Sequence, residues 1–212
     1  MADLTLAHLV ANGTMSDDIA STLRATAHGR HSFLVVAIPR LAGKSTVVAA
    51  MLAHRPKGAP LRTVGEDGVD IDTLAAASAG GYLVVPEVSE FPVTAGYIWG
   101  APVRRVFARI GDHVALAAAL HASGVDEAMD IVCRGNGVPD EQAARVALVI
   151  YIRSLGKDWR RPTGRRIAAV HEVEAVRDGR PETRQLHRWD ERADRFETLA
   201  EPRRIAVRRR AG

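Results

Sequence analysis

Apolar runs alternate with helix-like segments along the first three quarters of the chain. The runs are nearly continuous, which is typical of strands buried on both faces of a sheet. They cover residues 33–38, 82–85, 113–120 and 147–152, with a shorter strand expected at 61–64. Helices are predicted between them at 45–54, 71–79, 103–110 and 123–133, and from Pro139 onward. Alternating strands and helices predict an α/β fold with a mainly parallel sheet and helices on both faces.

The two ends of the chain have a different pattern. Residues 3–28 predict two helices separated at Asn12-Gly13, the second starting in the capping-box-like stretch 14–17. After about residue 160, strand-like segments at 166–173, 183–189 and 195–199 are separated by turn signals at 178–179 and 190–194. We therefore expect N-terminal helices over 1–30, an α/β core over 31–160, and a small C-terminal antiparallel β meander with a basic tail over 161–212.

Composition narrows the class of protein. The 47% hydrophobic and 25% charged content is ordinary for a soluble globular chain. No apolar run reaches the roughly 18 residues of a membrane span, and the N-terminus has Asp3 but no basic region typical of a signal peptide. The lone Cys133 excludes an internal disulfide and a CxxC zinc site. These features predict a cytoplasmic protein without a membrane span.

The stretch Leu41-Ala-Gly-Lys-Ser-Thr46 follows the first buried strand and opens a predicted helix. In a P-loop, backbone N–H groups surround the phosphates, a lysine contacts the β/γ oxygens, and the next hydroxyl binds Mg²⁺. Of the 29 basic residues only Lys44, Lys57 and Lys157 are lysines. A chain that rarely uses lysine would seldom place one directly after Gly43 by chance. The alternative is an ordinary helix N-terminus with Ser45 or Thr46 exposed.

Acidic residues follow two of the predicted strands, and histidines flank a third. Glu66 and Asp67 follow 61–64, while Glu87 and Glu90 follow 82–85. Strand ends of a doubly wound sheet meet at one crevice, where carboxylates could hold Mg²⁺ and polarise water. His121, at the far end of 113–120, could contact a γ-phosphate, whereas His113 has the weaker position. Any one of these acidic residues alone is better interpreted as a turn former, but four of them in register with the loop at 41–46 favour a metal-binding role.

These motifs resemble the hexameric ATPases of type II and type IV secretion and of type IV pili, over roughly residues 20–175. The phosphate loop of that family is similar to 38–46 here, its acidic box to 63–67, its Walker B stretch to 83–90 and its His box to 118–121. The resemblance implies a RecA-like P-loop NTPase core that binds Mg-ATP and forms a hexamer. It assigns catalysis to Glu87 and His121 and metal binding to Ser45, Glu66, Asp67 and Glu87. The expected nucleotide-binding residues are Pro39, Arg40, Leu41, Ala42, Gly43, Lys44, Ser45 and Thr46.

Several positions depart from that family pattern. Ile38 replaces the first glycine of the loop, Leu41 could crowd the phosphate, and Pro86 replaces the Walker B glycine. A β-branched Ile38 would strain a loop that needs positive φ at that position. Two readings therefore stay open: an ATPase related to secretion and pilus motors, or a catalytically degenerate domain that acts as a scaffold or regulatory partner. Arg104 and Arg105 are candidate arginine fingers, with a solvated helix face as the alternative.

A nucleic-acid-binding role is the third reading. The net charge is +4, and Arg203, Arg204 and the run 208–210 make the C-terminus basic. The run is short and has no interleaved aromatic residues, so a solvated tail is expected and nucleic acid is not. The expected partners are nucleotide and either further copies of the chain or secretion-type proteins.

Overall fold

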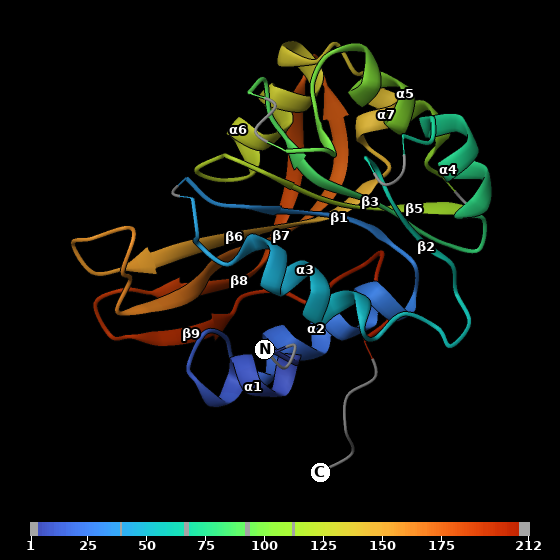
Figure 1. Cartoon of the computed structure of the whole chain (residues 1–212). Coiled ribbons are helices and arrows are strands. Elements are labelled where there is room, and N and C mark those ends of the chain that lie inside the picture. The colour runs from blue at the N-terminus through green and yellow to red at the C-terminus, as the bar shows by residue number, and fades with distance from the viewer. Residues whose placement is uncertain (1–3, 39, 66–67, 92–93, 112, 208–212) are drawn as a thin grey trace.

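The structure is a computed structural model that describes residues 4–38, 40–65, 68–91, 94–111 and 113–207. Within this part of the chain one nine-stranded sheet has the order β2-β3-β5-β1-β6-β7-β8-β9, with β4 paired to β3 (Figure 1). The strands are β1 (Ser32–Val36), β2 (Leu61–Thr63), β3 (Gly81–Val88), β4 (Tyr97–Ile98), β5 (Val114–Leu120), β6 (Val146–Leu155), β7 (Gly164–Arg177), β8 (Arg180–Asp190) and β9 (Arg195–Thr198). The helices are α1 (Leu6–Ala11), α2 (Asp17–His28), α3 (Lys44–Leu52), α4 (Ile71–Ala77), α5 (Ala101–Arg109), α6 (Val125–Asp130), the π-helix η1 (Ile131–Gly135) and α7 (Asp140–Ala143).

The first half of the sheet is parallel. β1 pairs in parallel with β5 and β6, and β3 pairs in parallel with β2 and β5. The predicted α/β architecture is therefore confirmed. β5 lies between β1 and β3, so the carboxyl ends of three adjacent strands face one side of the molecule.

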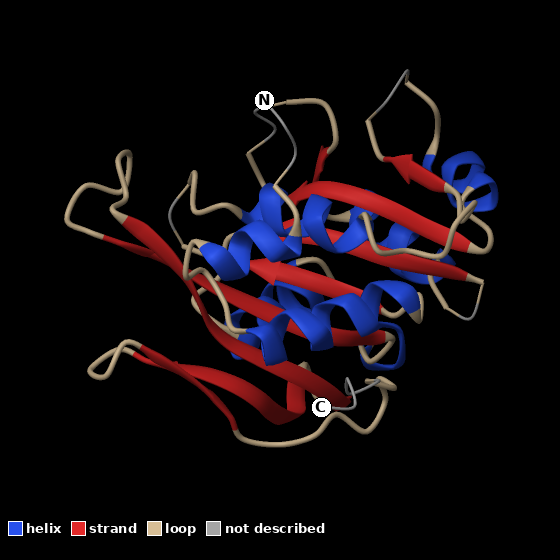
Figure 2. Cartoon of the chain, turned by 90° about the horizontal axis from the view of Figure 1, so that it is seen from below, coloured by secondary structure: helices blue, strands red, loops and turns tan. Residues whose placement is uncertain are grey.

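Side chains of β1 alternate between two apolar cores. Phe33 and Val35 pack in a core with α1, α2 and α3, whereas Leu34 and Val36 pack in a core with α4, α5 and α6. All five residues of β1 are buried, because helices cover both faces of the sheet. Figures 1 and 2 show helices lying across the strands, with α1, α2 and α3 gathered on one face. This double burial explains the continuous apolar runs in the sequence.

The C-terminal strands continue the same sheet as an antiparallel meander. β6 pairs with β7, β7 with β8, and β8 with β9, all antiparallel. Asp178 and Gly179 join β7 to β8 with φ values of 52° and 73°. Two successive positive φ values are the geometry of a type I′ hairpin turn. The meander and both of its turns agree with the sequence prediction.

Local capping differs slightly from expectation. α2 begins after Ser16, whose side chain accepts from Ile19 N, while Thr14 bonds instead to Asn12 Oδ1. The side chain of Thr5 caps α1, completing a capping box with His8. The two helices pack their apolar faces on the sheet, as the pattern predicts.

Strand β3 is longer than the sequence predicts. We expected it to end at Val85, with Glu87 in the following loop, but β3 runs through Pro86 and Glu87 to Val88. The pairing register with β5 shifts between Val85 and Val88, so Pro86 lies at an irregularity where a missing N–H is tolerated. Glu87 is thereby held by strand backbone, opposite Tyr97 of β4.

The basic residues after β9 are not the solvated tail that we expected. The backbone N–H groups of Arg203 and Arg204 donate to the fully buried carboxylate of Glu172 on β7. The Arg204 side chain also donates to backbone carbonyls, among them that of Val146. These two arginines fasten the segment to the sheet, while 208–210 lie outside the described residues.

Candidate nucleotide site at the start of α3

The loop between β1 and α3 turns tightly through two left-handed residues. Gly43 is the N-cap of α3 with φ 96°, and Leu41 has φ 63°. Among the described residues of this loop, the positive φ values fall on these two and not on Ile38. The strain that we expected at Ile38 therefore falls on Leu41, where the left-handed conformation costs about 1–2 kcal/mol.

Lys44 starts α3 and points away from solvent. Its Nζ lies 3.4 Å from Glu87 Oε2, and the two side chains are only 8% and 7% exposed. The other carboxylate oxygen, Glu87 Oε1, is buried without a hydrogen-bond partner among the described residues. An unsatisfied buried carboxylate oxygen is costly, so the site holds an acceptor ready for a donor.

His121 completes a triad with these two residues. Its Nδ1 lies 2.9 Å from the Ile38 carbonyl oxygen, and its Nε2 lies 3.9 Å from Glu87 Oε1. A carbonyl only accepts, so Nδ1 carries a proton and donates to Ile38. Lys44 Nζ, at 3.4 Å from the same nitrogen, is also a donor, so that contact is proximity rather than a hydrogen bond. His121 thus connects the start of the phosphate loop to Glu87.

Burial shifts both charged partners toward their neutral forms. Desolvation raises the pKa of Glu87, opposed by the positive charges of Lys44, His121 and Arg40. Desolvation likewise lowers the pKa of Lys44, opposed by the Glu87 carboxylate. A glutamate with a raised pKa is a better proton acceptor near neutral pH. A buried lysine beside an anion gains from further negative charge at the site.

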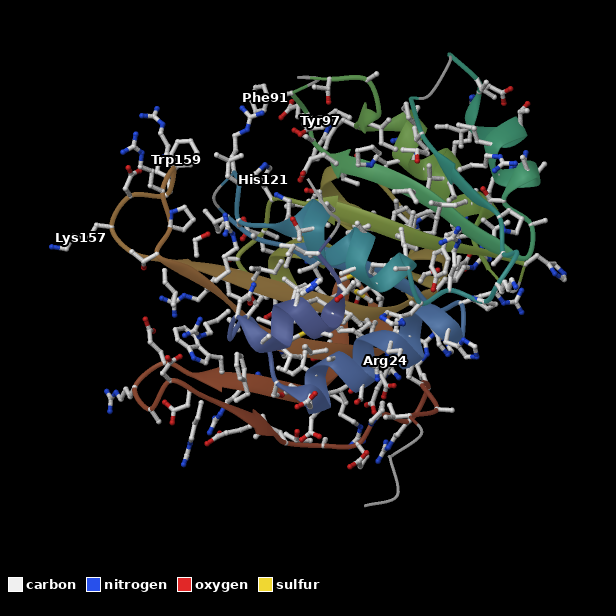
Figure 3. All side chains as sticks on the ribbon, turned by 60° about the horizontal axis from the view of Figure 1, so that its bottom comes forward. Arg24, Phe91, Tyr97, His121, Lys157 and Trp159 are labelled. Carbon is white, nitrogen blue, oxygen red and sulfur yellow. The ribbon has the colours of Figure 1, made fainter. Side chains whose placement is uncertain are left out.

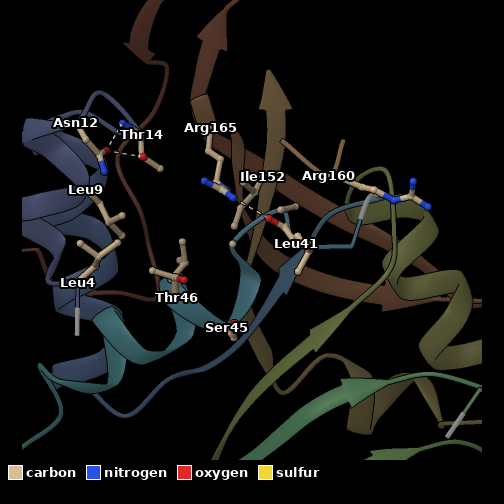
Figure 4. Close-up of a pocket in the computed structure, with 13 residues that line it drawn as sticks. Leu4, Leu9, Asn12, Thr14, Leu41, Ser45, Thr46, Ile152, Arg160 and Arg165 are labelled. Atoms are coloured by element: carbon tan, nitrogen blue, oxygen red, sulfur yellow. Dashed lines mark hydrogen bonds between the residues drawn. The ribbon is translucent and has the colours of Figure 1, made fainter. Parts of the chain in front are cut away.

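A pocket of about 390 Å³ opens beside the loop (Figure 4). Its volume lies within the usual range for small-molecule sites. The walls come from the N-terminal segment, from the loop with the first turn of α3, and from β6 and the hairpin that leads into β7. The lining residues are Leu4, Leu9, Asn12, Thr14, Leu41, Ala42, Gly43, Ser45, Thr46, Val47, Ile152, Arg160 and Arg165. Four predicted nucleotide-binding residues besides Leu41 therefore line one pocket: Ala42, Gly43, Ser45 and Thr46.

Arg165 of β7 reaches the loop before α3 from a distant part of the sequence. Its Nη2 donates to the Leu41 carbonyl at 2.9 Å (Figure 4). A Cβ atom added to Gly43 would lie 3.0 Å from Arg165 Cδ, so the arginine stem packs directly on the glycine. Gly43 is therefore constrained both by its positive φ and by this close approach.

Not every predicted site residue can be placed at the loop before α3. Pro39, Glu66 and Asp67 fall outside the described residues, so their assignments stay predictions. Glu90 is exposed beyond the end of β3. The histidine at the start of β5, His113, is also exposed. Figure 3 places His121 at the end of the sheet, on the side where Phe91 and Tyr97 lie.

The two candidate finger arginines lie on α5. Arg104 donates to the carbonyl of Asn136 at 2.7 Å, which fastens α5 to the segment after η1. Arg105 is exposed on the same helix. Both arginines are exposed, as on a solvated helix face, but the contact of Arg104 with Asn136 was not predicted.

The structure adds two basic residues that sequence reasoning did not select for the site, Arg160 and Arg165. Both belong to the hairpin and strand that follow β6, and both line the pocket. The dipeptide Arg165-Arg166 was visible in the sequence, but Arg166 instead pairs with Asp194 at 2.9 Å. The alternation of a β strand, which sends neighbouring side chains to opposite faces, was the available signal.

A Mg²⁺ site made wholly of protein ligands is not found. No group of three or more His, Cys, Asp or Glu residues in the described part of the chain could hold a metal ion. Nucleotide-bound Mg²⁺ commonly takes one or two protein oxygens and fills its shell with phosphates and waters.

None of the helices in the described ranges is long and apolar enough to cross a membrane.

Comparison with known proteins gives similarity at the level of structure. A scan against protein-family models and a search of curated proteins returned no match. The fold is similar to the VirB11 ATPase of the Brucella suis type IV secretion system in complex with sulphate, with 17% identity and a TM-score of 0.52 over 79% of this chain and 54% of that chain. The Legionella pneumophila ATPase DotB matches 87% of this chain and 52% of its own, at 13% identity and TM-score 0.43. NtrX from Brucella abortus in complex with ATP matches 64% of this chain and 34% of its own, at 13% identity and TM-score 0.41.

The chain spans about half the length of the VirB11 and DotB structures that it matches. At 17% identity the VirB11 likeness concerns the fold alone. Together with the parallel sheet, the loop before α3 and the antiparallel strands at the C-terminus, it gives this chain a P-loop ATPase-like fold, similar to that of the VirB11 ATPase.

Proposed function

We propose that this chain is a Mg-ATP-binding P-loop ATPase related to the motors of secretion and pilus systems. The observation that carries the proposal is the cluster of the buried Lys44 and Glu87 with the partly exposed His121, at the N-terminus of α3. A structural helix N-terminus needs no buried lysine, and a folded core gains little from a carboxylate with an unpartnered oxygen. The buried lysine suits an anionic ligand, whereas the unpartnered carboxylate oxygen suits a hydrogen-bond donor such as water.

In this proposal Lys44 exchanges partners when the nucleotide binds. The ammonium leaves Glu87 Oε2 for the β/γ-phosphate oxygens, which carry more negative charge than one carboxylate. The backbone N–H groups at the start of α3 contribute the positive end of the helix dipole. Arg40, whose charge already acts on both Lys44 and Glu87, adds to the positive potential.

Glu87 is then released to orient or deprotonate the attacking water. Its unpartnered Oε1 is the acceptor, and its raised pKa suits proton uptake. His121 lies between Glu87 and the Ile38 carbonyl, where it can report whether a γ-phosphate is present. Mg²⁺, when bound, would be held by Ser45 with assistance from Glu66 or Asp67, and would neutralise charge on the phosphates.

The alternative is a degenerate domain that serves as a scaffold or regulatory partner. Two observations favour it: Lys44 is already neutralised by Glu87, and Arg165 occupies the loop at Leu41 and Gly43. We propose a hexamer on the resemblance of the sequence motifs, and secretion-type protein partners because the VirB11 ATPase comes from a type IV secretion system.

Turnover separates these readings. Wild-type protein should release phosphate from Mg-ATP, and Glu87→Gln should reduce turnover at least about 100-fold while retaining nucleotide binding. Wild-type turnover in Glu87→Gln would remove the glutamate assignment. ATP binding with no turnover in the wild type would favour the degenerate domain.

A further inference from the structure

Arg165 combines three features that an ordinary structural arginine lacks. Its Nε is buried without a hydrogen-bond partner among the described residues. Its Nη2 donates to the Leu41 carbonyl, inside the phosphate loop. It also lines the same 390 Å³ pocket as Ser45 and Thr46 of α3.

The guanidinium has five N–H donors in a fixed fork, and the bond to Leu41 uses one of them. Nothing in the described part of the chain supplies a carboxylate to Arg165, in contrast to its neighbour Arg166, which pairs with Asp194. A buried donor without an acceptor is destabilising. An arginine fork matches two oxygens of a phosphate better than any other side chain does.

The pocket wall explains which anion fits. Gly43, Ser45 and Thr46 line the pocket at the N-terminal, positive end of α3. Arg160 adds another positive group, with its guanidinium over the Trp159 ring. Lys44, Glu87 and His121 are not among the residues that line this pocket, so its positive groups are Arg160, Arg165 and the start of α3.

We propose that Arg165 binds a phosphate of the nucleotide directly, from within the same chain. The inference rests on the proposed function and adds a phosphate ligand from the antiparallel meander to the one at Lys44. Nε–H donates to one phosphate oxygen, and Nη2, which has two hydrogens, donates one to a second phosphate oxygen and keeps the other on the Leu41 carbonyl. Nucleotide occupancy is thereby connected to β7, which lies at the boundary between the parallel strands and the meander.

Calorimetric titration of the full chain with Mg-ATP and with inorganic triphosphate tests this. Arg165→Leu keeps most of the stem that packs on Gly43 and should weaken binding of both probes at least about tenfold. Arg165→Lys retains the charge but not the fork and should recover only part of the loss. Arg161→Ala is the control, because Arg161 is exposed in the same hairpin and does not line the pocket.

A spectroscopic measurement distinguishes contact from loop support. The Nε–H resonance of Arg165, identified by its loss in Arg165→Lys, should move on adding Mg-ATP or triphosphate and stay unmoved on adding adenosine. Wild-type affinity in Arg165→Leu, or an Arg165 resonance that ignores saturating triphosphate, would overturn this inference while leaving the Lys44 site intact. Absence of binding in the wild type would instead overturn the proposed function, and the inference with it.

Discussion

Lys44 and Glu87 form a buried pair whose energetics follow directly from its geometry. At 3.4 Å and an effective dielectric constant of about 20, the attraction between the two charges is about 5 kcal/mol. Burial offsets much of that gain, because both side chains are more than nine-tenths removed from solvent. Removing one partner leaves the other charge buried and uncompensated. We therefore expect Lys44→Met and Glu87→Gln each to lower the free energy of unfolding by about 3 kcal/mol.

The double variant Lys44→Met/Glu87→Gln should lose much less than the sum of about 6 kcal/mol, giving a coupling of at least about 2 kcal/mol. Urea unfolding of the four proteins measures each free energy. The pH dependence adds a second check. In Lys44→Met the unpaired Glu87 has a native pKa above its unfolded value of 4.5, so the native state binds more protons than the unfolded state. The free energy of unfolding of this variant therefore falls as pH rises from 4.5 toward the native pKa.

The other single variant should respond in the opposite sense. Lys44 in Glu87→Gln has a native pKa below its unfolded value of 10.5, so the unfolded chain binds more protons and stability increases as pH rises toward 10.5. Strictly additive single variants, or pH profiles parallel to the wild type, would refute the buried-pair reasoning. The double variant also provides a folded protein without the lysine for nucleotide-binding experiments.

Three further predictions concern other parts of the structure. Glu172→Ala removes the buried acceptor of the Arg203 and Arg204 N–H groups and should lower the free energy of unfolding in urea by about 3 kcal/mol. Hydrogen exchange at 203–207 should become faster, and an unchanged exchange rate there would contradict the anchoring. Leu41→Gly should be neutral or stabilising by up to about 1 kcal/mol because φ is 63°, whereas Leu41→Val should destabilise; the same sign for both would refute the strain. Burial lowers the pKa of His187 to about 4, so the free energy of unfolding should fall by up to about 3 kcal/mol as pH drops from 6.5 to 4. His187→Gln should lack this pH-dependent loss when urea unfolding is compared at pH 7 and pH 5.

The architecture could be predicted from local patterns, because each strand of the parallel half is buried on both faces. The run 33–38 is apolar at every position up to Ile38, and only helices on both sides of a sheet require that. The position of the loop between β1 and α3 could be predicted for the same reason, because it follows a buried strand and opens a helix. The extent of β3 could not be predicted, because a proline normally ends a strand. Here the shifted register with β5 accommodates Pro86.

The candidate site was predicted in its local parts and missed in its long-range part. Lys44, Glu87 and His121 each follow or end an apolar run, so the order of parallel strands brings them together. Arg165 reaches Leu41 across 124 positions of sequence, through the pairing of β6 with β7. The spacing of residues in the sequence does not predict that contact, because the contact depends on which face of β7 the arginine side chain occupies.

Calorimetric binding of Mg-ATP to the wild-type chain, to Lys44→Ala and to Lys44→Met/Glu87→Gln tests the central claim most directly. The account predicts saturable binding to the wild type that disappears in both variants, with the folded double variant showing that the loss is not due to unfolding. No binding in the wild type, or equal binding in all three proteins, would contradict a nucleotide site at Lys44.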